Sequence, residues 1–154
     1  MGGILLMGFM VGLGRYVRHW GMLPVTVAGI IMAGGVVLVG VYPASQPDGH
    51  RQAAMLVFLG GWSTFALFTA ALWLAKPPRL ALWLAVPSLL AMFTFAVFLL
   101  LPPFRFERSY RVLFLGPPGD ERPFLWLPSL LEWSVFISVA AWVLTLSVYL
   151  VLQE

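Results

Sequence analysis

Four long stretches of the chain carry almost no charge, and they limit most strongly what the chain can fold into. They cover residues 22–42, 53–75, 80–101 and 125–151, and Glu132 is the one charged side chain among them. A helix rises about 1.5 Å per residue, so about 20 apolar residues cross the hydrocarbon core of a bilayer. The sequence therefore predicts an all-α fold, a polytopic bundle with four full transmembrane spans.

Composition supports the bilayer as the solvent of this chain. Hydrophobic residues make up 61% of the 154 residues and charged residues only 10%. A soluble domain carries about 25% charged residues, so this chain has too few charges to cover a water-facing surface. We therefore expect one integral-membrane domain over residues 1–154, located in the plasma membrane.

The same composition argues against several kinds of site. The chain has no cysteine, which excludes disulfides, thiolate metal sites and a cysteine nucleophile. Two histidines are too few for a three-histidine metal site, and we expect no metal and no cofactor. The net charge of +3 comes mostly from arginines in the connections, so nucleic acid is not an expected partner.

An apolar run at residues 2–14 precedes the four spans and is too short to cross a bilayer by itself. No basic segment comes before it, as a signal peptide would require. Two interpretations stay open. The run is either a short, partly inserted helix or the last part of a truncated span.

Small side chains recur at helical spacing within the spans. Where lipid removes the hydrophobic drive for association, small residues let helices approach closely, so these faces predict packing seams. A second copy of the chain or a partner membrane subunit would use similar seams. The faces comprise Thr26, Gly29, Ala33 and Gly40; Ala53, Gly60, Thr64 and Ala71; and Ser134, Ser138, Ala141 and Thr145.

Residues 41–54, VYPASQPDGHRQAA, are the most chemically diverse connection. Pro43 is expected to stop the preceding helix, and the Pro-Asp-Gly run from Pro47 is typical of a turn. Asp48 is expected to cap the next helix, with His50 in its first turn.

The connections divide between the two sides of the membrane. Residues 15–21 and 76–79 lie on one side, and each holds two basic residues in a few positions, which predicts the cytoplasmic side. Residues 43–51 and 102–123 then share the outer face. There they would form a polar mouth of the bundle.

This mouth holds the candidate site residues. A histidine beside carboxylates and arginines is suited to general-base chemistry on a phosphate-bearing substrate. The candidate catalytic residues are His50, Asp48 and Glu121. The candidate contacts to lipid headgroups or to the mouth are Arg51, Arg105, Arg108, Arg111, Arg122 and Glu132.

Three functions are compatible with these features. The favoured one is a non-enzymatic bundle that packs with itself or a partner, because no complete catalytic constellation is present. The first alternative is an enzyme acting on a lipid or small solute through His50. The second is a transporter subunit, although three spans have no charge to offer near mid-bilayer. Membrane lipids are expected partners in each case.

The run GVYPASQPDGHRQAAMLVF resembles the signature segment of the domain of unknown function 998 family of prokaryotic multi-pass membrane proteins. The run GDERPFLWLPSLLEW resembles the late segment of that family. Ala44 and Ser45 stand where the family tends to have an acidic residue. Family members generally have more spans, so the resemblance implies that residues 2–14 are a truncated span. It implies no activity. The matching positions are Pro43, Asp48, Gly49, His50, Gly119 and Arg122.

Overall fold

The computed structural model describes residues 1–100 and 127–153, and helices account for most of them. No strand occurs in these two ranges, so the predicted all-α fold is confirmed. A π-helical turn, η1, continues α3, and a 3-10 turn, η2, leads into α4. The elements are α1 (Gly2–Val17), α2 (Met22–Val41), α3 (Pro47–Ala70), η1 (Ala71–Ala75), η2 (Leu82–Leu84), α4 (Ala85–Leu100) and α6 (Leu127–Val151).

Within the described ranges, four helical stretches are long and apolar enough to cross a membrane. They are Met22–Val41, Pro47–Ala75, Leu82–Leu100 and Ser129–Val151, and the shorter apolar helix is Gly2–Val17. The protein is thus a multi-pass membrane protein with four spans and one short N-terminal helix, as the sequence predicts.

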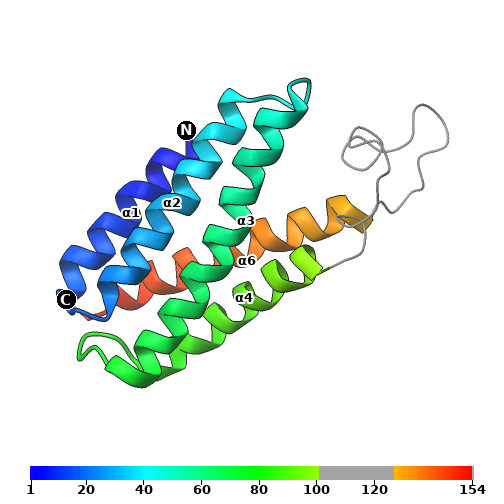
Figure 1. Ribbon diagram of the computed structural model, residues 1–154. Coiled ribbons are helices and arrows are strands. Elements are labelled where there is room, and N and C mark those ends of the chain that lie inside the picture. Colours follow the sequence, from blue (N-terminus) through cyan, green and yellow to red (C-terminus); the bar gives the residue numbers. More distant parts are fainter. Residues whose placement is uncertain (101–126, 154) are drawn as a thin grey trace.

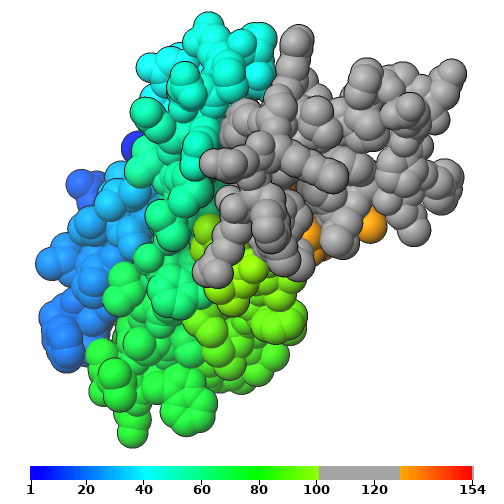
Figure 2. Space-filling view, turned by 45° about the vertical axis from the view of Figure 1, so that its right-hand side comes forward, coloured from blue at the N-terminus to red at the C-terminus, as the bar shows by residue number. Residues whose placement is uncertain are grey.

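The helices pack in the order of the chain. α1, α2 and α3 lie side by side with alternating directions, and α4 lies against α3 (Figure 1). α6 crosses behind α3 and contacts α4 along its length. The two chain ends lie at opposite ends of the bundle (Figure 1). In the space-filling view, α2, α3 and α4 form a continuous face without a break between them (Figure 2).

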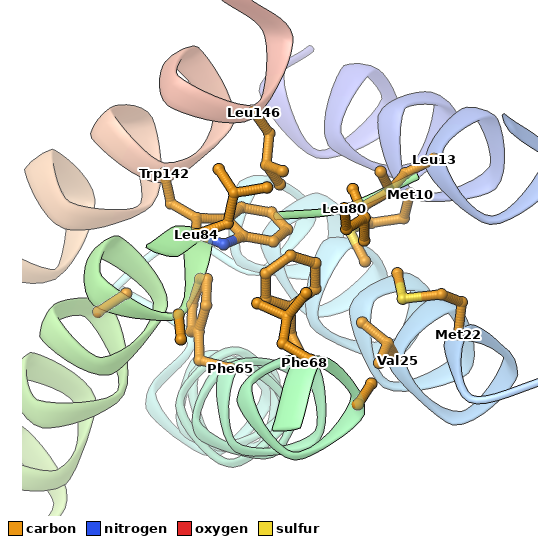
Figure 3. Close-up of a cluster of buried hydrophobic side chains, with 14 of the residues drawn as sticks. Met10, Leu13, Met22, Val25, Phe65, Phe68, Leu80, Leu84, Trp142 and Leu146 are labelled. Atoms are coloured by element: carbon orange, nitrogen blue, oxygen red, sulfur yellow. The ribbon is translucent and has the colours of Figure 1, made fainter. Parts of the chain in front are cut away.

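The core is centred on Trp142 of α6, whose side chain is fully buried. Its indole meets Phe65 and Phe68 of α3 edge to face, with ring centroids 5.1 and 5.2 Å apart (Figure 3). It also meets Phe9 of α1 edge to face, with the centroids 5.8 Å apart. Such edge-to-face pairs stabilise beyond simple contact area. One tryptophan therefore joins α6 to two helices that precede it in the chain.

Glycines set the closest approaches between helices. A Cβ atom on Gly35 would lie 2.8 Å from the backbone nitrogen of Val57, and one on Gly60 would lie 3.1 Å from the Cα of Met32. α2 and α3 therefore touch through their backbones. A Cβ on Gly3 would similarly lie 2.7 Å from the carbonyl oxygen of Ala33, where α1 meets α2.

The small-residue faces expected to be seams differ in burial, and on α6 the prediction fails: Ala141 is exposed, and Ser134, Ser138 and Thr145 are only half-buried. Gly29 and Ala33 of α2 are buried, whereas Gly40 at the end of that stripe is exposed. On α3, the whole expected face is buried: Ala53, Gly60, Thr64 and Ala71.

Hydroxyl groups tie α4 to both neighbours. Thr69 Oγ1 donates to Ser88 Oγ at 3.0 Å, and Ser88 Oγ donates to the Phe65 carbonyl at 3.0 Å. On the other side, Thr94 and Ser138 share a hydrogen bond of 2.9 Å. Polar groups in an apolar solvent need such partners, so these bonds specify which helix faces meet.

Three helices begin or end several residues away from the expected limits. α1 runs to Val17 instead of residue 14, and α3 begins at Pro47 instead of residue 53. α4 begins at Ala85 instead of residue 80, because the 3-10 turn η2 precedes it. Charged and polar residues end a membrane-spanning stretch, but they do not end a helix. In the headgroup region their side chains reach water while the backbone keeps its helical hydrogen bonds. The expected cap is wrong: the N-cap of α3 is Gln46, and Asp48 lies inside the first turn.

Candidate functional site

The connection between α2 and α3 is closed by His50. Its Nδ1 lies 2.8 Å from the carbonyl oxygen of Tyr42, the residue that caps the C-terminus of α2. A carbonyl can only accept, so Nδ1 carries the proton and donates. The carbonyls at a helix end have no partner within the helix, and the imidazole supplies one here.

The residues around His50 also have structural roles. The ring of Tyr42 packs over Gly49, where a Cβ atom would lie 2.7 Å from the Tyr42 Cδ1. Gln46 N–H donates to the Pro43 carbonyl at 2.8 Å, and His50 N–H donates to the Gln46 carbonyl at 3.0 Å. This connection is therefore a compact turn in which Pro43, Gly49 and His50 each hold the backbone in place.

An open groove of about 550 Å³ runs along the first turns of α3. Among the described residues it is lined by Asp48, Arg51, Gln52, Met55 and Leu56, which share one helical face. His50 projects about 160° away from Asp48 at 100° per residue. The helix thus places Asp48 and Arg51 together and turns the imidazole to the other side.

Glu132 lies in the first turns of α6 and is exposed. α6 begins at the same end of the bundle as α3 (Figure 1), so this carboxylate and the connection that holds His50 lie at one end. Close to the end of its span, a carboxylate costs less than it would at mid-bilayer.

Five of the predicted site residues lie outside the described residues. They are Arg105, Arg108, Arg111, Glu121 and Arg122. Within the described ranges, no group of three histidine or acidic side chains is arranged to hold a metal ion. What these ranges supply at this end is a helix-closing imidazole, the Glu132 carboxylate and a separate groove with one acidic and one basic side chain.

The opposite end contains contacts that the sequence reasoning missed. Arg79 donates from Nη1 to the Tyr16 carbonyl, and its guanidinium lies 5.1 Å from the centroid of the Tyr16 ring. A Cβ atom on Gly21 would lie 2.6 Å from the Cβ of Ala75. The two short basic connections therefore pack together at one end, as the topology predicts. The sequence held one indication of this contact: Tyr16 and Arg79 belong to the two short basic connections that are predicted to share a side.

We expect His50→Ala to lower the free energy of unfolding by about 0.5–1.5 kcal/mol, the usual net value of one hydrogen bond. The Tyr42 carbonyl would lose its donor. Thermal unfolding in mild detergent would measure the loss, and Gln52→Ala on the opposite face of α3 is the matched control. Unchanged stability of the His50 variant would contradict the structural role.

Scans against family models, curated proteins and solved structures match nothing to this chain. The resemblance of the connection around Pro43 and His50 to the domain of unknown function 998 family stays a prediction. The contacts, burial and charges of the described residues are therefore the basis for a function, and they identify an integral, multi-pass membrane bundle.

Proposed function

We propose that this protein is a non-enzymatic membrane protein that acts by helix–helix association in the bilayer, pairing with a second copy through the outer face of α1. The observation that carries the proposal is the arrangement of glycines on α1. Gly3 and Gly14 meet α2, whereas Gly8 and Gly12 would meet no atom within 4 Å if each carried a Cβ.

Gly8 and Gly12 are both exposed and lie one turn apart on the same face. Small residues at this spacing let two membrane helices approach until their backbones touch. A glycine inside a helix costs about 1 kcal/mol relative to alanine, and close packing is what offsets that cost. Within one chain nothing packs on this face among the described residues, so a second helix would supply the contact.

A second copy is the occupant that the geometry favours. A glycine face is self-complementary, so the same surface serves both partners in a two-fold dimer. Exposed Ile4 and Leu5 flank the beginning of this face and would pack around the contact.

The described residues give less support to catalysis or transport. His50 is engaged by the Tyr42 carbonyl and lies away from Asp48, so a base tuned by that carboxylate is not assembled. The buried polar side chains among them, Thr64 and Ser88, are both hydrogen-bonded within the bundle, which suits packing more than a solute path.

The test is self-association of purified protein in mild detergent and in liposomes. Native mass spectrometry and cross-linking should show a dimer, and Gly8→Leu and Gly12→Leu should each weaken dimerisation about tenfold. Gly34→Leu is the matched control, because Gly34 also has no atom within 4 Å of an added Cβ but lies on α2. A wild-type monomer under all conditions, or equal dimerisation of all variants, would overturn the proposal.

A further inference from the structure

The end of the bundle opposite His50 gathers four cations. Arg15 and Arg18 lie at the end of α1, and Lys76 and Arg79 lie in the connection after η1. The contact between Gly21 and Ala75 and the bond from Arg79 to the Tyr16 carbonyl hold these segments side by side.

All four cations are exposed, and acidic groups lie elsewhere in the described ranges. Asp48 and Glu132 are the acidic side chains within residues 1–100 and 127–153, and they lie at the beginnings of α3 and α6. Those helix starts are at the other end of the bundle (Figure 1). The basic end therefore has a positive field that no described carboxylate offsets.

Two of the cations occupy an unusual backbone position. Arg18 ends α1 with φ 48° and Lys76 ends η1 with φ 47°, both in the left-handed region. Glycine is the residue that adopts this conformation readily at a helix end. A cation at each helix end also offsets the partial negative charge of the last carbonyls. That effect explains one charge per helix, but not four charges at a single end.

The surroundings of the cations are apolar and aromatic. Trp20, Trp73, Trp83 and Leu74 are exposed around the same connections. Tryptophan side chains prefer the boundary between headgroups and acyl chains, so this end lies at headgroup depth. Arg79 is already held by Tyr16, which leaves Arg15, Arg18 and Lys76 to meet an anion there.

We infer that this basic end, formed by residues 15–21 and 76–79, binds an anionic phospholipid, with Arg18 and Lys76 contacting its phosphate and the exposed tryptophans lying along its acyl chains. Cations at this depth attract anionic headgroups by about fivefold in affinity per charge. The inference concerns a different end and different residues from the face of α1 proposed for self-association, and neither depends on the other.

The test is lipid binding by the full chain in mild detergent, measured by native mass spectrometry against equimolar phosphatidylglycerol and phosphatidylcholine. We expect preferential retention of phosphatidylglycerol. The double variant Arg18→Gln/Lys76→Gln should weaken that binding about 25-fold, since two charges are lost. Arg18→Lys/Lys76→Arg, which exchanges the two side chains and keeps both positive charges, is the matched control and should bind like wild type. In detergent the protein has no membrane orientation that a lost charge could alter. A change in lipid retention therefore reports binding alone.

Two further arms keep the inference open to refutation. Arg18→Gly/Lys76→Gly relieves the backbone conformation, so it should fold at least as well as wild type and still lose phosphatidylglycerol. Glycerol phosphate, added in place of lipid, should compete poorly because it lacks acyl chains. Equal retention of both lipids, unaltered binding by either double variant, or full competition by glycerol phosphate would each overturn the inference.

Discussion

Replacing Gly35 by leucine is expected to disrupt the packing of α2 against α3 and to lower the free energy of unfolding by about 3 kcal/mol, the upper range for an overpacked core. An added Cβ would lie 2.8 Å from the backbone nitrogen of Val57 and 3.0 Å from the Cβ of Leu56. Neither atom belongs to the flexible end of a side chain. The helices must therefore separate, which also loosens the contact between Gly60 and Met32.

The neighbouring glycine provides the control. Gly34 would meet no atom within 4 Å, so Gly34→Leu should change stability by less than about 0.5 kcal/mol. Both variants add the same side chain to the same helix, one position apart. Unfolding in micelles titrated with a denaturing detergent would measure the difference. Equal losses in the two variants would show that α2 and α3 do not meet through Gly35.

The second large effect is expected at Trp142. Trp142→Ala should lower the free energy of unfolding by about 3–5 kcal/mol, because it leaves a cavity among three aromatic rings. The indole is fully buried and joins α6 to Phe9, Phe65 and Phe68. The loss here comes from dispersion contacts, since lipid is itself apolar. Unfolding in micelles again provides the measurement.

Two variants separate packing from other effects of tryptophan. Trp133→Ala removes an exposed tryptophan of the same helix and should cost much less. Trp142→Phe should cost less than alanine, because it keeps a ring and removes an Nε1–H that has no hydrogen-bond partner within the described ranges. If Trp142→Ala were as stable as Trp133→Ala, the central position of this side chain would be wrong.

The spans were predictable because bilayer crossing depends on local hydropathy and length. α2 begins at residue 22 as expected and ends one residue earlier, where Tyr42 caps the helix ahead of Pro43. α3 was less predictable. The Pro-Asp-Gly run reads as a turn, yet Pro47 is the first helical residue, where its missing N–H needs no partner.

That difference in helix start changes the candidate site. Because the helix begins at Pro47, its periodicity already separates His50 from Asp48 and Arg51. From the sequence, all three are neighbours in one polar connection. In the structure, Asp48 and Arg51 line the groove, while the His50 ring binds the Tyr42 carbonyl.

By itself the sequence determined the all-α fold, the number of spans and that residues 15–21 and 76–79 share one end of the bundle, since each follows from apolar length and chain alternation. It also identified the small-residue face of α3 that packs, and part of the one on α2. Only the tertiary structure decided which faces meet, that Trp142 lies at the centre and that Arg79 pairs with Tyr16. These contacts join residues far apart in the chain, and their partners depend on how whole helices cross, which no local pattern encodes.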